Sequence, residues 1–482
     1  MSVKANAHHR RVAAACLAGW AGLAAPVCAG SLEANRALIL TDNAFTADKH
    51  ILDQACIWVE LYYRMDENEG LIYDPEAPEV VFGRVPLRNL TAKAAEDSLA
   101  HAREALRESL YGLAVAPEPE WTDKQKSLRR YFPAAWTQGD IAVSAERITG
   151  RRGMRKSFRT SLEASLPYQA MMDSAFRNAG LPARLKWLAH VESRFNPDAV
   201  SPAGAAGMWQ FLKSSGSRYL IIDERIDQRF DPDAATVAAA SYLKLCRAYL
   251  GSWPLAIMSY NNGPGQMLDA VKETGSRDAS EIIRTYQSGG FGKVSRAYYA
   301  MFLAASSLGM QSDRLFPGLK KSRPGSPVFK TLQLEHEWTP RQLRILSGYS
   351  TAVLMKYNPA LRHLVFERNL PLPKGFVLKL PMGLPSTQDL QFADLRIAGE
   401  GVDESRLRPG VAGLPVPKFA ESALQRVRNA LFPGRRRDDQ PVLAYMHSQG
   451  LLDAERLTLA KQDRILIEPH PALHAMLRNM GG

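Results

Sequence analysis

Two short segments, residues 191–211 (VESRFNPDAVSPAGAAGMWQF) and residues 258–265 (MSYNNGPG), constrain this chain more than any other feature. The first places one carboxylate, Glu192, at the end of an otherwise apolar helical pattern, and a glycine-rich turn then leads to Gln210. The second is a Tyr-Asn pair that opens onto a Gly-Pro-Gly loop. Glycine permits positive φ and lets backbone approach a ligand closely. Because catalytic and binding side chains act together only when they lie close in space, we expect both segments to line one groove that contains Glu192.

The helix that carries Glu192 is predicted over residues 183–195. It is expected to end before Pro197, because a residue that precedes proline is disfavoured in the α region. Leu185, Leu188 and Glu192 fall at spacings i, i+3 and i+7, so the carboxylate shares a face with two leucines. A carboxylate among apolar side chains loses hydration, and we therefore expect its pKa to rise.

A raised pKa is what a general acid needs near neutral pH. The alternative is a solvated glutamate paired with Arg194 or Lys186, since glutamate is rarely buried. The motif around Glu192 favours the catalytic interpretation. The nearest other acids in sequence are Asp198 and Asp223, and we interpret Asp198 as structural because an Asp in a turn more often bonds to backbone.

Over about residues 147–310 the chain resembles the lytic transglycosylases of the SLT, lysozyme-like superfamily. Trp209 and the segment 231–246 are most similar to the membrane-bound D-type branch. The resemblance implies that Glu192 is the single catalytic acid/base. It also implies a set of substrate-binding residues, which are Ser201, Gln210, Tyr260, Asn261 and Tyr298. One position departs from the family pattern: Val294 stands where many relatives have an acidic residue, which puts an auxiliary carboxylate in doubt.

The reaction implied by this family needs one carboxylate, whereas ordinary glycosidases use two. Glu192 would protonate the leaving oxygen of the β-1,4 bond between N-acetylmuramic acid and N-acetylglucosamine. It would then accept the proton of the muramoyl C6 hydroxyl, which attacks its own anomeric carbon and leaves a 1,6-anhydromuramoyl end. Two alternatives stay open: a muramidase that hydrolyses the same bond, and a non-catalytic peptidoglycan-binding envelope protein. No metal or cofactor is expected.

Residues 1–29 are predicted to be a signal peptide, with a basic start, an apolar stretch and a Val-Cys-Ala cleavage site. We therefore expect a periplasmic protein, with lipoprotein anchoring through Cys28 as a minor alternative. The formal net charge of +12 falls to +9 without the three basic residues of the signal. A basic surface suits peptidoglycan glycan strands as the partner; no nucleic-acid-binding signature accompanies it. Cys56 and Cys246 are either a disulfide or two buried thiols.

The predicted fold class is mainly α, with a lysozyme-like (SLT) catalytic domain and a small βααβ LysM-like C-terminal module. The expected domains are a mostly helical region at 30–145, the catalytic domain at 146–315, the module at 328–385 and a region of unknown role at 386–482. In the first region, Leu99, Ala102, Leu106, Leu110 and Leu113 indicate one amphipathic helix, and a Pro-Glu-Pro-Glu stretch near Pro117 resembles a linker. LysM modules bind N-acetylglucosamine chains; a packing appendage to the catalytic domain is the alternative.

Further helices are predicted at 169–179, 234–250 and 293–309. The module is expected to contain strands at 329–334 and 376–380 and helices at 340–346 and 351–357.

Overall fold

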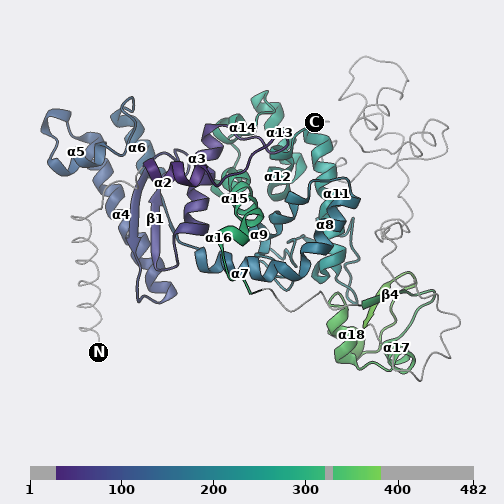
Figure 1. The fold of residues 1–482 in the computed structure, drawn as a ribbon. Coiled ribbons are helices and arrows are strands. Elements are labelled where there is room, and N and C mark those ends of the chain that lie inside the picture. Colours follow the sequence, from purple (N-terminus) through teal and green to yellow (C-terminus); the bar gives the residue numbers. More distant parts are fainter. Residues whose placement is uncertain (1–28, 321–328, 382–482) are drawn as a thin grey trace, which may run out of the picture. The chain divides into compact units, whose positions relative to one another are not determined.

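The computed structural model describes residues 29–320 and 329–381 (Figure 1). These residues form two compact units. The first unit combines the chain up to Leu162 with Ala270–Leu319, and the second combines Glu163–Asp269 with the chain from Lys320 onward. This division by packing cuts across the predicted domains, whose boundaries stay predictions. The predicted signal peptide up to residue 28 and the region 386–482 lie outside the described residues.

The prediction of a mainly helical chain is confirmed (Figure 1). The helices of the first unit are α2 (Ala29–Arg36), α3 (Lys49–Val59), α4 (Ala92–Val115), α5 (Asp123–Arg129), α6 (Gln138–Arg147), α14 (Ala279–Thr285), α15 (Lys293–Met310) and α16 (Ser312–Leu315). Two more helices, α7 (Arg155–Ser165) and α13 (Pro264–Thr274), run across the unit boundaries in the sequence. Among the described residues, no helix has both the length and the apolar character that crossing a membrane requires.

The first unit also contains a three-stranded antiparallel sheet, which the sequence analysis did not predict. Its strands β1 (Glu69–Tyr73), β2 (Val81–Pro86) and β3 (Thr149–Arg152) lie in the order β2-β1-β3. Two glycines of the sheet, Gly70 and Gly150, lie so close to Leu99 that an added Cβ would be 2.7 Å from its side chain. The strands are short, and β3 has the sequence TGRR, without the alternation of apolar and polar residues that marks a strand.

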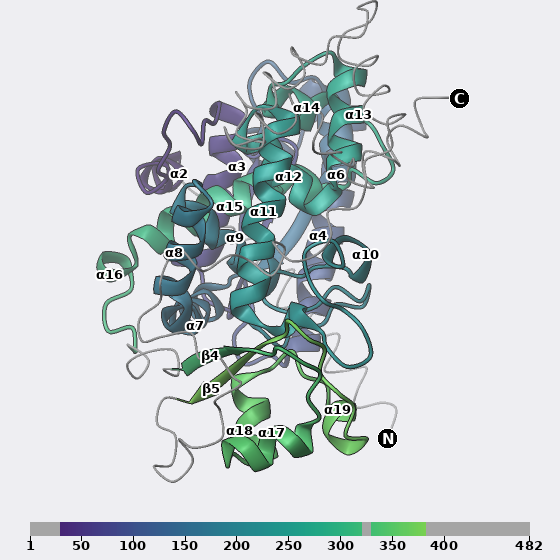
Figure 2. The ribbon, with the colours of Figure 1, turned by 90° about the vertical axis from the view of Figure 1, so that its right-hand side faces the viewer.

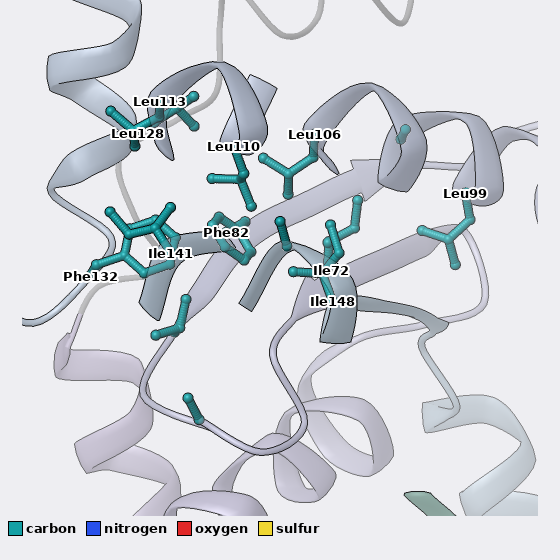
Figure 3. Packing of buried hydrophobic residues seen from close by; sticks show 14 of the residues in the cluster. Ile72, Phe82, Leu99, Leu106, Leu110, Leu113, Leu128, Phe132, Ile141 and Ile148 are labelled. Atoms are coloured by element: carbon teal, nitrogen blue, oxygen red, sulfur yellow. The ribbon is translucent and has the colours of Figure 1, made fainter. Parts of the chain in front are cut away.

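The predicted amphipathic helix is α4, and all five of its predicted apolar positions are buried. They form one hydrophobic core with residues from the sheet, from α5 and α6 and from the segment between these helices, including Phe82, Phe132 and Ile141 (Figure 3). Trp121 belongs to the same core, and its indole Nε1 donates to the carbonyl of Ala116 at 2.9 Å. The predicted linker near Pro117 is therefore wrong: Glu118–Glu120 is a short, exposed 3₁₀ turn between α4 and α5, and both of these helices pack into one core.

Helix α15 joins the first unit from far along the chain. The Tyr299 hydroxyl donates to the Thr46 carbonyl at 2.9 Å, and the amide of Leu40 donates to the Ser307 hydroxyl at 2.9 Å. Helix α15 is also buried along most of its length. Its packing against α3 makes residues 270–319 part of the N-terminal unit.

The second unit contains the segment with both sequence motifs. Its helices are α8 (Gln169–Asn178), α9 (Leu188–Ser193), α10 (Lys213–Gly216), α11 (Pro232–Leu250) and α12 (Trp253–Asn262). Asp231 caps the start of helix α11: its side chain accepts from two first-turn amides, and Pro232 takes the first helical position. It packs against both α8 and α12.

The two cysteines of the described residues are free and buried, Cys56 in the first unit and Cys246 in the second. Burial raises the pKa of each thiol to about 12. Both side chains are therefore unreactive thiols at neutral pH. Of the two alternatives that the sequence left open, the structure has two buried thiols.

Residues 329–381 form a small module within the second unit. It consists of β4 (Phe329–Gln333), α17 (Pro340–Ser347), α18 (Thr351–Tyr357), α19 (His363–Glu367) and β5 (Val377–Pro381). The two strands pair antiparallel, and the helices lie on one side of them (Figure 2). The predicted strand–helix–helix–strand order is confirmed, with α19 as an additional short helix. The likeness to LysM modules stays a prediction.

Candidate active site

The chain around Glu192 is more sharply bent than predicted. Residues Ala183–Trp187 form a 3₁₀ stretch, and α9 ends at Ser193, so the prediction of one helix over 183–195 is wrong at both ends. Arg194 and Phe195 both adopt the left-handed conformation, with φ of 56° and 59°. The amide of Phe195 donates to the Ala189 carbonyl at 3.2 Å, which closes the helix end before the proline is reached.

Burial of Phe195 explains why the chain accepts this turn. Its side chain is 1% exposed and meets the ring of Trp187 edge to face, with ring centroids 5.7 Å apart. Two consecutive left-handed residues other than glycine are strained, and such conformations persist only where the surroundings hold them. The turn places Glu192 within two residues of the end of its helix.

Glu192 is half-buried, and the two leucines predicted to share its face, Leu185 and Leu188, are fully buried. His190 is buried as well, and burial, followed by the charge of Arg194, lowers its pKa to about 3. The imidazole is therefore neutral at physiological pH. The predicted rise in the pKa of Glu192 stays a prediction.

Three segments meet at the backbone of Met208 and Trp209. The Ser193 hydroxyl, at the end of α9, donates to the Met208 carbonyl at 2.7 Å. The Tyr260 hydroxyl, near the end of α12, donates to the Trp209 carbonyl at 2.8 Å. Burial, and then the charge of Glu192, raises the pKa of Tyr260 well above its usual range. The structure thus brings Glu192, the glycine-rich turn and Tyr260 together.

An aromatic cluster packs around the side chain of Tyr260. Its ring lies 5.4 Å from that of Tyr242 and 6.1 Å from that of Phe211, between ring centroids. Trp209 is fully buried, and its indole Nε1 donates to the Thr236 hydroxyl at 2.9 Å. These rings anchor the turn to α11 and fix the direction in which Tyr260 points.

The glycine-rich turn is closed by two of the five side chains that were predicted to bind substrate. The Ser201 hydroxyl accepts from the Ala205 amide at 3.0 Å. The Gln210 side-chain Nε2 donates to the Gly207 carbonyl at 2.8 Å and to the Ala199 carbonyl at 3.2 Å. Gln210 itself adopts a left-handed conformation with φ of 50°. In this structure Ser201 and Gln210 hold the shape of the turn, and their contacts with substrate stay a prediction.

Gly207 is required where it stands. Its φ is +76°, and a Cβ at this position would lie 1.7 Å from the Arg229 carbonyl oxygen. Gly204 also has a positive φ, +79°, but a Cβ there would meet no heavy atom within 4 Å. Backbone packing therefore requires glycine at position 207, whereas at position 204 only the positive φ favours glycine.

Asn261 is exposed on the last turn of α12, beside Tyr260. The predicted Gly-Pro-Gly loop that follows is wrong in detail. Gly263 is the only residue between two helices: its amide donates to the Ser259 carbonyl at 2.7 Å, and α13 begins at Pro264. Proline suits a first helical position because its missing N–H would have no partner there.

Tyr298 lies on α15 in the first compact unit and is 2% exposed. Val294, which replaces the acidic residue of many relatives, is exposed on the first turn of the same helix. The structure describes Glu192 and Tyr298 in different units, so a role for Tyr298 at the site stays a prediction.

Sequence reasoning missed Arg229, which contacts the turn from outside, and Asp227, which is paired with Arg229. The Arg229 guanidinium donates to the carbonyls of Gly204 at 2.9 Å and Phe211 at 3.2 Å, and it forms an ion pair with Asp227 at 2.8 Å. Neither residue belongs to a recognisable motif. Within the described ranges, no group of three or more His, Cys, Asp or Glu side chains is arranged to hold a metal ion.

Comparison with known proteins identifies this part of the chain. Residues 171–283 match the family described as "Transglycosylase SLT domain". This segment is a transglycosylase SLT domain. It contains Glu192, the whole glycine-rich turn and the Tyr260-Asn261 pair.

Similar proteins include the membrane-bound lytic murein transglycosylase D of Escherichia coli K12, which is 28% identical over 201 residues. That match covers 41% of this chain and 43% of the relative. The membrane-bound lytic murein transglycosylase F of Pasteurella multocida is 28% identical over 173 residues, with 33% of this chain and 34% of the relative covered. The chain thus spans less than half the length of the curated relatives it matches.

Among solved structures, an inactive variant of the lytic transglycosylase Slt from Pseudomonas aeruginosa matches with 20% identity and a TM-score of 0.26. The match covers 46% of this chain and 33% of that chain. The assignment of the SLT domain rests on the sequence matches and not on this structural similarity.

Proposed function

We propose that this protein is a peptidoglycan lytic transglycosylase and that Glu192 is its single acid/base. The observation that carries the proposal is the meeting of three segments of the SLT domain. The hydroxyls of Ser193 and Tyr260 donate to adjacent carbonyls of the glycine-rich turn. The charge of Glu192 contributes, after burial, to the raised pKa of the Tyr260 hydroxyl. A catalytic carboxylate needs neighbours whose positions are fixed in this way.

The reaction proceeds in two proton transfers. Glu192, as the acid, protonates the oxygen that links N-acetylmuramic acid to N-acetylglucosamine, and the bond from that oxygen to the muramoyl C1 breaks. The muramoyl C6 oxygen then forms a bond to C1, and its proton returns to the Glu192 carboxylate. The products are a strand that ends in N-acetylglucosamine and one with a 1,6-anhydromuramoyl end. No water is consumed, because the tethered C6 hydroxyl replaces it.

The predicted substrate contacts are the residues around this carboxylate. Tyr260 is protonated at neutral pH, as tyrosine ordinarily is, and burial and the charge of Glu192 raise its pKa further; its hydroxyl donates to the Trp209 carbonyl. Asn261 is exposed next to Tyr260, while Ser201 and Gln210 shape the turn. Tyr298 completes the set implied by the family. The chemistry requires no cofactor.

The substrate fits an exported protein. The predicted signal peptide directs the chain to the periplasm, where peptidoglycan lies, and the net charge of +9 that remains favours an anionic wall polymer. The relatives with the same domain are named as membrane-bound murein transglycosylases. We infer that glycan strands are the partner of this chain and that the module at 329–381 binds N-acetylglucosamine as LysM modules do.

Analysis of the cut ends tests this proposal. Purified sacculi are incubated with the full-length protein, and the released muropeptides are identified by mass spectrometry. Release of 1,6-anhydromuramoyl products is the expected result. Reducing muramoyl ends would show hydrolysis by a muramidase instead, and binding to sacculi without any release would show a non-catalytic envelope protein.

A further inference from the structure

The contacts of Arg229 connect both ends of the glycine-rich turn. One nitrogen, Nη1, donates to the Gly204 carbonyl near the start of the turn and to the Phe211 carbonyl at its end. The other two nitrogens bind Asp227, Nε to Oδ1 at 2.9 Å and Nη2 to Oδ2 at 2.8 Å. Both side chains are largely buried, 11% exposed for Arg229 and 8% for Asp227. A planar guanidinium paired at two points with a carboxylate has a fixed orientation.

The turn held by Arg229 needs support from outside. Gly204, Gly207 and Gln210 all have positive φ. For Gln210, unlike the two glycines, the side chain makes this conformation unfavourable. Strained backbone of this kind persists where neighbouring groups determine it. The carbonyl of Arg229 also lies where the Cβ of any other residue at position 207 would be, so the segment that carries Arg229 packs directly on the turn.

The opposite side of this segment is held by the C-terminal module. The amide of Asp227 donates to the Ala360 carbonyl at 2.8 Å, and the amide of Arg362 donates to the Arg225 carbonyl at 3.0 Å. Ile226, between them, is fully buried in the hydrophobic core of the module. Residues 225–229 therefore lie between the module on one side and the glycine-rich turn on the other.

We propose that Arg229 and Asp227 are positioning residues for the saccharide site and that the module at 329–381 supports them. In this arrangement the module shapes the active site in addition to any glycan that it binds. The inference rests on the proposed function, since the turn matters for catalysis only if Glu192 beside it cleaves glycan.

Three variants of the full-length chain test the proposal. Arg229→Gln removes the ion pair with Asp227 and cannot reach both ends of the turn. Arg229→Lys keeps the charge beside Asp227. Arg344→Gln is the matched control, because Arg344 is exposed on α17, away from residues 225–229 in the sequence.

The first measurement is kcat and KM on soluble glycan strands, at a temperature well below each unfolding midpoint. Arg229→Gln is expected to lower kcat about 10- to 100-fold, with a smaller change in KM, because small misplacements of catalytic groups have effects of that size. Arg229→Lys should recover part of the loss, and Arg344→Gln should match wild type. A wild-type kcat for Arg229→Gln would overturn the proposal.

The second measurement is hydrogen exchange, which separates local positioning from general destabilisation. In Arg229→Gln the amides of residues 205–210 should exchange faster while those of α11 and α12 are unchanged. Uniformly faster exchange across the second unit would also overturn the proposal, because it would make Arg229 an ordinary stabilising residue. If wild type releases no product but the local exchange effect is present, the proposed function fails and the positioning of the turn by Arg229 stands.

Discussion

Glu192 is half-buried at the end of a short helix, beside a tyrosine whose hydroxyl is held in place by the backbone of the turn. Replacing Glu192 with Gln removes the acidic proton while it keeps the size of the side chain. General acid–base assistance is worth roughly 10²- to 10⁴-fold. Because one group serves both proton transfers, we expect Glu192→Gln to lose activity at or beyond the upper end of that range. Anhydromuropeptide release from sacculi measures the loss.

Asp198→Asn is the matched control for this experiment. Asp198 is an exposed acid six positions further along, in a turn where its amide binds the Asn196 side chain at 3.0 Å. The control should retain wild-type activity, and both variants should keep the wild-type circular dichroism spectrum. Near-normal product release by Glu192→Gln would show that another group is the acid.

His190 gives the SLT domain a dependence of stability on pH. Its pKa is about 3 in the folded protein, because it is buried and lies near Arg194, against about 6.5 in an unfolded chain. Below pH 6.5 the unfolded state therefore binds a proton that the folded state does not. Stability from neutral His190 is complete above pH 6.5 and falls as the pH drops toward 3, by about 2 kcal/mol at pH 5.

We expect His190→Gln to remove this contribution. Urea unfolding at pH 7.5 and pH 5 checks it: the loss of stability between the two pH values should be about 2 kcal/mol smaller in the variant than in wild type. Equal losses in both proteins would mean that His190 takes up its proton as readily when folded as when unfolded.

At the scale of elements, the glycine-rich turn allows a comparison of two glycines with nearly the same φ. Gly207→Ala places a methyl group 1.7 Å from the Arg229 carbonyl, so backbone must move. Gly204→Ala adds a methyl group in open space and bears only the left-handed conformation, about 1–2 kcal/mol. We expect Gly207→Ala to destabilise by clearly more than Gly204→Ala. Denaturant unfolding of both variants measures the difference, and equal effects would contradict the described packing.

The helices show which structural features the periodicity of the sequence could predict. The buried face of α4 and the ends of α11 were predictable, because apolar spacing, Pro232 and Gly251 mark them in the chain itself. The end of α9 was not, since it depends on the burial of Phe195 against Trp187, which is a tertiary contact. Strand β3 was missed for the same reason: its residues TGRR become a strand only by pairing with β1.

The residues of the candidate site also differ in whether the sequence could predict them. Glu192, Gln210 and Tyr260 could be predicted as site residues because they stand in recognisable motifs at characteristic spacing. Arg229 was missed because its contacts with the turn are to backbone carbonyls, and a carbonyl accepts a bond whatever its side chain is. Asp227 was missed because it acts on the turn only through its ion pair with Arg229. Such residues leave no pattern in one sequence, and only the folded chain shows them.

At the scale of the molecule, one buried ion pair links the C-terminal module to helix α11. Lys379 is 8% exposed, and its Nζ binds the carboxylate of Asp231 at 2.7 Å and also that of Asp233. Burial alone would lower the pKa of Lys379, but the charges of the two carboxylates raise it overall. Lys379→Met would leave Asp231, which caps α11, buried without this partner.

We expect Lys379→Met to destabilise the protein by about 3 kcal/mol, as removal of one member of a buried pair does. Lys356→Met is the control: Lys356 is exposed on α18, and surface changes of this kind usually stay within about 0.5 kcal/mol. Calorimetric unfolding measures both. A loss below 1 kcal/mol for Lys379→Met would show that the module and α11 unfold independently.

The return of α15 to the N-terminal unit has a consequence for how the chain acquires its structure. The bond from Tyr299 to Thr46 joins residues 253 positions apart, and the SLT domain lies in between. Closing so long a loop is entropically unfavourable, and distant contacts slow folding. As the polypeptide emerges from the ribosome or from a translocation channel, α3 cannot pack against α15 until α15 has been made, whereas α11 can pack against α8 and α12 earlier. The last part of the N-terminal unit to be made is therefore synthesised after the domain that carries Glu192.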